Sequence, residues 1–329
     1  MSRALVLGGT GVIGRAVAGR LLADGWSVHV TGRDEARVPS ALVDAGVRFS
    51  SVERDDEAGL REALGSGVDL LVDCLCFTAA HARSLIPLAR HANSTVMMSS
   101  RAVYIDGDGN HVNSAVAPRF DGPVTEQQPT VAPGSMPYDS PEGYGPNKVA
   151  AERTLLDSGL PVTVLRPSRV HGPGALSPRE WYFLKRALDR RPAVLLAGRG
   201  ADHASAAVNI AALVALVADR PGRRILNAAD PDAPDVLSIS RIIAAAAGHS
   251  WREVLLGDDA PPGLGRHPWH RVPPIVLDLS AAYAVGYRPA GDYATTVQEE
   301  LRWLMSSPPR AAGPANFDYA AEDAYLRSR

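Results

Sequence analysis

The sequence has little of what secreted, membrane-spanning and metal-binding proteins usually carry. Its 329 residues include only two cysteines, Cys74 and Cys76. Separated by one residue in an apolar run, they supply neither a disulfide framework nor a four-ligand zinc site, and we expect no metal. No uninterrupted apolar run is long enough to span a bilayer, and no basic segment precedes the first apolar run at the N-terminus. These absences disfavour secreted and membrane proteins and favour a cytoplasmic one.

The chain also lacks an excess of charge of either sign. It has 34 Lys and Arg residues against 36 Asp and Glu residues, a formal net charge of −2. A near-neutral chain offers no general electrostatic reason to bind nucleic acid or an anionic membrane. With 46% hydrophobic and 21% charged residues, the composition is that of a globular protein. The partner we expect is a small-molecule substrate.

Short apolar runs alternate with helical patterns through the first half of the chain. The predicted strands are 4–7, 27–31, 47–52, 70–73, 95–99 and 162–165. The predicted helices are 12–23, 35–45, 58–64, 79–90 and 144–157. Strands alternating with helices indicate βαβ units, and their right-handed crossovers make the sheet parallel and doubly wound. The fold class we predict is therefore α/β, with a Rossmann-type sheet and a smaller C-terminal substrate-binding lobe.

The second half of the chain has a less regular pattern. It contains helical patterns at 178–189, 209–218 and 238–247, the last with Ser238 as its N-cap, and a short returning strand at 224–227. The predicted division is a dinucleotide-binding domain over 1–166 with returning elements at about 205–228, a substrate-binding lobe over 167–204 and 229–305, and an extended C-terminal arm over 306–329. The arm is expected to pack on the body through Phe317, Tyr319 and Tyr325.

One segment breaks the alternation in the first half. Residues 106–141 are rich in Gly, Pro, Asp, Asn and Ser and show little periodicity. A loop of this length inside a compact domain is usually a functional loop or a disordered one. Because it lies between a strand end and a helix that carries reactive side chains, we interpret it as a lid or substrate loop.

The first strand ends in a glycine-rich loop. Three glycines stand three apart, where they permit a tight turn, a close backbone approach to a pyrophosphate and close packing of the next helix. That helix directs its N-terminal amides and partial positive charge at the phosphates. The strand before the loop and the helix after it make this pattern specific. The residues predicted to bind the dinucleotide here are Gly8, Thr10, Gly11, Val12, Ile13 and Gly14.

The end of the second strand bears on the choice of cofactor. NAD-binding proteins usually place an Asp or Glu there to accept from the ribose 2′-hydroxyl. This chain has Arg33, which is suited to a bidentate contact with a 2′-phosphate, followed by Asp34, which we interpret as a helix N-cap. The pattern favours NADP, with NAD as the alternative.

Three further side chains indicate acid–base chemistry. Tyr144 and Lys148 are four residues apart, so on a helix they share one face. A phenol titrates near pH 10 and needs a neighbouring positive charge to exchange protons at neutral pH. Ser99 and Ser100 end a predicted strand, at the sheet edge where ligands bind, and a serine hydroxyl there suits a substrate oxygen. The alternatives are a surface Tyr–Lys pair and serines that only end a strand.

With these motifs and the run Arg166–Pro173 in order, the first 175 or so residues resemble the extended or atypical branch of the short-chain dehydrogenase/reductase superfamily. The resemblance implies Ser100, Tyr144 and Lys148 as catalytic residues, Lys148 also contacting the nicotinamide ribose. It places Pro167, Ser168 and Val170 beside the nicotinamide and Arg54 in the region that meets adenine. The remaining cofactor contacts that it implies are Cys74, Leu75, Cys76 and Ser99. Members of this family often form homodimers.

The chain departs from relatives that act on nucleotide-linked sugars. The region 198–209 lacks the arginine and aspartate that those relatives usually carry there. We therefore expect a smaller or less charged substrate, with Arg101, His171 and Trp269 as the candidate substrate-binding residues. His267 and His270, without a third ligand nearby, do not make a metal site.

Three hypotheses for the function follow. The first is an NADP-dependent oxidoreductase, a carbonyl reductase or secondary alcohol dehydrogenase, that uses Ser100, Tyr144 and Lys148 for hydride and proton transfer. The second is an epimerase or dehydratase of a sugar-like substrate that retains NAD. The third is a non-catalytic family member that senses cofactor or associates with RNA. The presence of all three catalytic residues and the near-neutral charge favour an enzyme.

Overall fold

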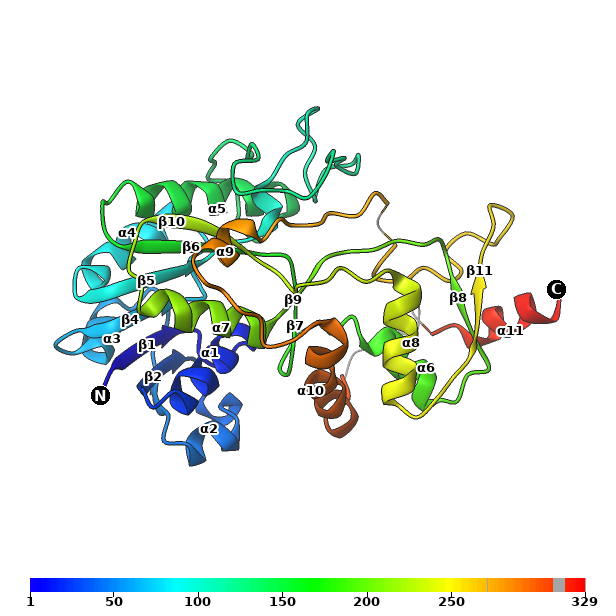
Figure 1. Cartoon of the computed structure of the whole chain (residues 1–329), viewed down its shortest axis with the longest axis horizontal. Helices are drawn as coiled ribbons and strands as arrows, with labels where there is room; N and C mark the ends of the chain where they lie inside the picture. Colours follow the sequence, from blue (N-terminus) through cyan, green and yellow to red (C-terminus); the bar gives the residue numbers. More distant parts are fainter. Residues whose placement is uncertain (271, 310–316, 329) are drawn as a thin grey trace.

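A seven-stranded parallel sheet forms the centre of the first part of the molecule in this computed structural model, which describes residues 1–270, 272–309 and 317–328 (Figure 1). The strand order is β10-β6-β5-β4-β1-β2-β3. The order reverses between β1 and β4, and ligands of such sheets bind at this point, outside the carboxyl ends of the strands. The predicted Rossmann-type fold is confirmed. The strands are β1 (Arg3–Leu7), β2 (Ser27–Gly32), β3 (Arg48–Ser51), β4 (Val68–Asp73), β5 (Ala92–Met98), β6 (Val162–Pro167) and β10 (Arg224–Ala228).

Helices cover both faces of this sheet. In β1, Ala4 and Val6 face one apolar core while Leu5 and Leu7 face the other, as the alternation of a strand requires. The first core is closed by α1 (Val12–Ala23), α2 (Ser40–Asp44) and α7 (Ala207–Ala218), and the second by α3 (Glu57–Leu64), α4 (Ala79–Ala89) and α5 (Pro141–Leu156). Near-continuous apolar strands are what a sheet buried on both faces requires.

The remaining elements form a smaller lobe beside the sheet (Figure 1). Its core joins aromatic and aliphatic side chains of α6 (Trp181–Leu188), α8 (Val236–Ala246) and α10 (Tyr293–Ser306). The short strands β8 (Ala193–Leu196) and β11 (Arg252–Leu255) pair in parallel at its edge. Between lobe and sheet lies a second pair, β7 (Arg169–His171) with β9 (Ala204–Ala206), and α9 (Ser280–Ala284) packs near β10. No helix in the described ranges has both the length and the apolar character to cross a membrane.

Several element boundaries differ from the sequence-based expectations. The helix expected over 35–45 is split by Pro39 into the 3-10 helix η1 (Glu35–Arg37) and α2. The N-cap of α8 is Asp235, which accepts from the Ser238 amide at 2.8 Å, so Ser238 is not the cap. Helix α5 begins at Pro141, because the Ser140 hydroxyl caps it through the Gly143 amide.

The arm expected to be extended contains a helix, α11 (Tyr319–Arg327), at the far end of the lobe (Figure 1). The Phe317 ring packs 6.4 Å from Tyr182, and the Tyr319 hydroxyl donates to Asp189 at 2.6 Å. The arm therefore packs on α6 and the residues after it. Its segment 310–316 lies outside the described residues.

The segment 106–141 has no regular element longer than a single bridge before α5. It is nevertheless attached to the body at several points. Tyr104 pairs with Thr130, Val124 pairs with Leu277, and the Glu126 carboxylate accepts from the Asn227 amide at 2.7 Å. The segment is thus held to Tyr104, to Asn227 of β10 and to Leu277.

Candidate active site

The glycine loop has the geometry of a phosphate cradle. Gly8 has φ +82°, a conformation that favours glycine. A Cβ atom at Gly14 would lie 2.3 Å from the Gly8 carbonyl oxygen, and one at Gly9 would lie 2.3 Å from Val30. Gly11 is exposed and no side chain caps α1, so its first-turn amides remain available to an anion. These residues fit a dinucleotide pyrophosphate.

The other predicted members of the loop surround this cradle. Thr10 is buried and its carbonyl accepts from the Arg15 guanidinium at 2.9 Å. Val12 and Ile13 are partly exposed at the start of α1. A Cβ atom at Gly172 would contact the Val12 side chain at 3.4 Å, so the loop directly adjoins the end of β7.

Three arginines gather where β2 ends. Asp34 caps η1 by accepting from the Ala36 amide at 3.0 Å, so its predicted role as an N-cap is confirmed. Arg33 is exposed and forms no hydrogen bond or ion pair through its side chain with another described residue. Arg15 donates to the Arg37 carbonyl at 3.3 Å, and burial together with the Arg37 charge lowers the pKa of Arg15. Sequence reasoning missed Arg15 and Arg37, although Arg15 directly follows the last loop glycine.

Helix α5 brings Tyr144 and Lys148 to the carboxyl end of β5. Gly145 lets the helix approach the 3-10 helix η2 (Arg101–Val103), because a Cβ atom there would lie 2.8 Å from the Ala102 carbonyl oxygen. The Lys148 Nζ lies 5.9 Å from the centre of the Tyr144 ring. The Ser100 Oγ accepts from the Ala102 amide at 3.1 Å and keeps its own hydrogen to donate.

Lys148 is buried, but its ammonium group forms hydrogen bonds with two backbone carbonyls. Its Nζ donates to the carbonyls of Cys76 and Met98, each at 2.8 Å, at the ends of the strands β4 and β5. It also lies 4.3 Å from the centre of the Phe77 ring, which stacks on Tyr138 from the 106–141 segment at 5.1 Å. An ammonium has three donors, so one N–H remains.

Ser99 does not direct its side chain at a cofactor, which corrects the prediction for this residue. It is buried, and its hydroxyl donates to the Glu152 carboxylate. Glu152 in turn holds Arg166, with Nε at 3.0 Å and Nη2 at 2.5 Å. A buried carboxylate needs such a paired cation, and Ser99 is part of that ion-pair network.

The side chains of Arg54, Cys74 and Cys76 are enclosed by contacts within the protein. The Arg54 guanidinium is buried against Asp73, at 2.7 and 3.0 Å, and donates to the His81 carbonyl at 2.7 Å. Asp73 also accepts from the Leu75 amide at 2.8 Å, which shapes the turn 74–76. Burial raises the pKa of both thiols, Cys74 and Cys76, to about 12, so neither is a thiolate at neutral pH.

The segment after β6 adjoins the loop and has one free polar group. The Ser168 amide donates to the Ser205 hydroxyl at 2.8 Å, but the buried Ser168 Oγ has no hydrogen-bond partner among the described residues. Pro167 is buried and Val170 is partly buried against the first core. An unpaired buried hydroxyl beside the glycine loop fits a bound polar group such as the nicotinamide carboxamide.

The three predicted substrate-binding residues are buried in contacts with the protein itself. Arg101 is 5% exposed and forms a two-pronged ion pair with Asp202, which also holds Arg169. Trp269 is 2% exposed and stacks on Phe183 at 5.4 Å. Neither side chain is presented to a ligand, so these two predictions are corrected: burial of a cation requires a paired anion, and the lobe core absorbs the indole.

His171 is likewise 1% exposed. Its ring lies between the carboxylates of Asp230, at 3.1 Å, and Glu300, at 3.3 Å. The prediction of a substrate contact for His171 is therefore corrected as well. Its surroundings are taken up below.

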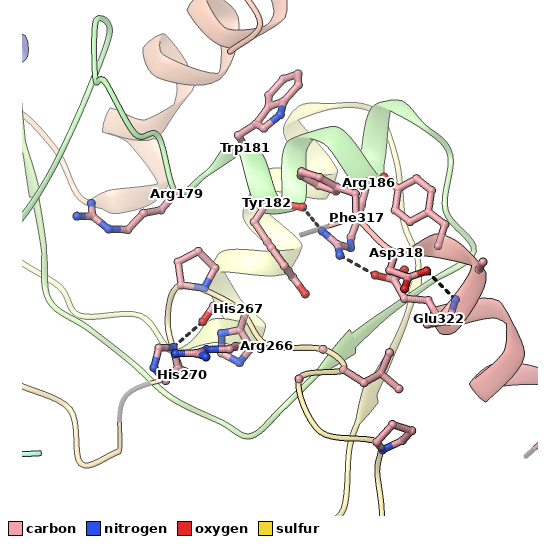
Figure 2. A pocket seen from close by; sticks show the side chains of 18 of the residues that line it. Arg179, Trp181, Tyr182, Arg186, Arg266, His267, His270, Phe317, Asp318 and Glu322 are labelled. Atoms are coloured by element: carbon pink, nitrogen blue, oxygen red, sulfur yellow. Dashed lines mark hydrogen bonds and ion pairs between the residues drawn. The ribbon is translucent and has the colours of Figure 1, made fainter. Parts of the chain in front are cut away.

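A cavity of about 1440 Å³ opens in the lobe, and Ser100, Tyr144 and Lys148 are not part of its lining. Figure 2 shows Trp181, Tyr182 and Phe317 along one side and His267 and His270 opposite them. The aromatic side chains come from α6 and the C-terminal arm. This cavity belongs to the lobe and is separate from the glycine loop.

Comparison with known proteins places the chain in a family of NAD-dependent enzymes. The family model described as "NAD dependent epimerase/dehydratase family" matches residues 4–205. No curated protein sequence matches the chain. Among solved structures, dTDP-glucose 4,6-dehydratase from Bacillus anthracis is similar with TM-score 0.69 at 16% identity, over 96% of this chain and 100% of that one. UDP-glucose 4-epimerase from Thermotoga maritima has TM-score 0.69 at 17% identity, over 93% and 99% of the two chains. At these identities the structural likeness shows the fold.

Proposed function

The chain belongs to the NAD-dependent epimerase/dehydratase family, and from this premise we propose that it oxidises and re-reduces a secondary alcohol on a sugar-like small molecule, as an epimerase does. The observation that carries the proposal is the meeting of Ser100, Tyr144 and Lys148 at the end of β5, beside the glycine loop. Membership of a family of enzymes also argues against a non-catalytic role.

The three side chains divide the proton chemistry among them. A bound nicotinamide supplies the hydride acceptor and donor. The Ser100 oxygen accepts from the Ala102 amide, and its hydrogen remains free to be donated to the substrate oxygen. Tyr144 would take the proton of the substrate hydroxyl when the alcohol is oxidised and would return it when the carbonyl is reduced on its other face. The Lys148 ammonium lies 5.9 Å from the centre of the Tyr144 ring, and its free N–H is available to a ribose hydroxyl.

The surrounding carboxylates favour redox chemistry over elimination of water. Elimination needs a base for a carbon-bound proton and an acid for the leaving hydroxyl. Glu152 and Asp202, the buried acids attached to the neighbours of Ser100, are both committed to arginines. We therefore place epimerisation before dehydration.

The arginines at the end of β2 support a second candidate, an NADPH-dependent carbonyl reductase. Arg15, Arg33 and Arg37 offer positive charge where a ribose 2′-phosphate would lie, and Asp34 is turned toward its own helix. A 2′-phosphate on the cofactor is typical of reductive enzymes that exchange it at each turnover. The family supports NAD in general terms, and NADP is the finer proposal.

We propose that residues 167–204 and 229–305 select the substrate. Arg169 replaces Arg101 as the candidate contact, because its side chain is 26% exposed whereas that of Arg101 is 4% exposed. With Asp202 shared between two arginines, this group keeps a positive charge that favours an anionic or strongly polar substituent.

The test is inversion at a carbinol carbon. The protein is incubated with free and nucleotide-linked sugars, and stereochemistry is followed by NMR. Tyr144→Phe should lower the rate about 10²- to 10⁴-fold and leave dinucleotide binding intact, while Tyr283→Phe, at an exposed tyrosine of α9, should leave the rate unchanged. Full turnover by Tyr144→Phe would contradict the proposed mechanism.

A further inference from the structure

Four titratable side chains meet in the interior where the sheet joins the lobe, away from the proposed catalytic residues. His171 ends β7, Asp230 follows β10, Glu180 precedes α6 and Glu300 lies in α10. None is more than 3% exposed. Three carboxylates and one imidazole are therefore enclosed together, which is costly unless something neutralises them.

The cluster contains polar atoms without partners. The Nδ1 atom of His171 and both carboxylate oxygens of Glu300 are buried and have no hydrogen-bond partner among the described residues. Nδ1 and a Glu300 oxygen are 3.3 Å apart without forming a hydrogen bond. One ligating atom from each of His171, Glu180 and Glu300 lies within 4.8 Å of the other two. Unpaired groups of this kind are rare in protein interiors.

Asp230 fixes the orientation of the imidazole. One Asp230 oxygen accepts from the Ala206 amide at 2.7 Å and from Asn209 at 2.8 Å. The other faces Nε2 of His171 at 3.1 Å. In the neutral tautomer whose Nε2 donates its hydrogen to Asp230, the lone pair is on Nδ1, the nitrogen that faces Glu300. A carboxylate that orients a histidine in this way is the usual outer contact of a metal-binding imidazole.

The carboxylates of Asp230, Glu180 and Glu300 surround a single imidazole in this cluster. The Tyr293 hydroxyl, at 3.4 Å from a Glu180 oxygen, is a neutral donor. A cation between the three ligands removes this repulsion and supplies the missing partners at once.

We propose that His171, Glu180 and Glu300 hold one divalent first-row transition-metal ion, of which zinc is the best match. One imidazole nitrogen with two carboxylate oxygens suits this class, whereas magnesium and calcium prefer oxygen alone. The ion would tie β7, the start of α6 and α10 together, so its role is structural. This inference departs from our expectation of no metal, because the three ligands are too far apart in the sequence to form a motif.

The test is metal analysis of protein produced without an affinity tag in zinc-supplemented medium. Wild type should carry about one zinc per chain, and His171→Gln and Glu300→Gln should each lose at least about nine-tenths of it. Glu299→Gln, an exposed neighbour on α10, is the matched control and should retain the ion. Equal zinc in all four proteins would place the ion elsewhere and overturn the proposal.

A second measurement covers variants that fail to fold. Wild-type protein is unfolded, freed of metal with a chelator and refolded with zinc, cobalt or magnesium. Zinc should raise the melting temperature by several degrees and magnesium should not, and cobalt should give the visible absorption of a nitrogen- and oxygen-ligated ion. Wild type that takes up neither zinc nor cobalt, with an unchanged melting temperature, would show that protons alone neutralise the cluster and would overturn the proposal.

Discussion

Two buried polar networks lie on either side of the segment that leaves β6, and they are built differently. The residues flanking Ser100 enter the first: Ser99 joins Glu152 and Arg166, and Arg101 joins Asp202. Every carboxylate there has an arginine. The second, around His171, has three carboxylates that bind no arginine in the described part of the chain, and the Glu300 oxygens have no hydrogen-bond partner there.

The difference suits the two networks to different tasks: the first positions a side chain, and the second binds a further group. A network in which each charge is paired holds its members in one arrangement and offers nothing to a ligand. Because this network holds both neighbours of Ser100, Ser99 and Arg101, it fixes Ser100 at the end of β5. A network with surplus negative charge and unpaired atoms is incomplete without a further group. The predictions below test this contrast, from the largest expected effect to the smallest.

Breaking the paired network should have the largest effect. Glu152→Leu leaves the Arg166 guanidinium buried without an anion, and should lower the free energy of unfolding by about 3–5 kcal/mol. The double variant Glu152→Leu/Arg166→Met removes both charges and should recover much of that loss. Urea unfolding measures both proteins. A single variant as stable as wild type would show that the pair contributes no more than a surface contact.

Removing the side chain that the paired network positions should affect rate and not stability. Ser100→Ala deletes the hydroxyl that donates to the substrate oxygen, and should lower turnover about 10²-fold with KM nearly unchanged. The melting temperature should stay close to that of wild type, because the Oγ makes one local contact. Kinetics of the inversion assay provide the measurement, and a change in KM alone would assign Ser100 to substrate binding instead.

A surplus of positive charge lies at the end of β2, where Arg33 follows the strand. Arg33→Ala should weaken NADPH binding about tenfold and leave NADH binding unchanged, because only NADPH carries the 2′-phosphate. Fluorescence titration measures both affinities. Arg153→Ala, at an exposed arginine of α5, is the control. Equal losses for the two nucleotides would remove Arg33 from the 2′-phosphate site.

The smallest effect concerns a histidine without any carboxylate. Burial lowers the pKa of His267 to about 4 from its usual 6.5, and the ring faces the Gly198 carbonyl at 3.3 Å with no carboxylate partner among the described residues. The unfolded chain therefore takes up a proton first, and stability should fall as the pH drops through this window. His267→Gln should flatten the fall in melting temperature between neutral and acidic pH, whereas the exposed His91→Gln should not.

The sequence predicts the parts of this protein whose signals are local. The glycine spacing, the alternation of strands and helices and the four-residue spacing of Tyr144 and Lys148 each depend on neighbours in the chain. The structure brings Ser100, Tyr144 and Lys148 to one strand end, as the resemblance implies.

The errors arise where a distant segment decides the environment of a side chain. Arg101 and His171 were assigned to the substrate, but Asp202 and Asp230 enclose them. Trp269 was assigned to a pocket wall, but Phe183 covers it. No local pattern identifies a partner that lies tens of residues away.

The most direct test of the account is the nucleotide that the purified protein binds. Mass spectrometry of material released on denaturation is combined with titration of NADPH and NADH. The account predicts a nicotinamide dinucleotide at about one per chain: retained NAD would support the epimerase, and an empty site that prefers NADPH would support the reductase. Protein that retains no nucleotide and binds neither NADPH nor NADH would contradict the assignment of the glycine loop and of the Ser100, Tyr144 and Lys148 site beside it.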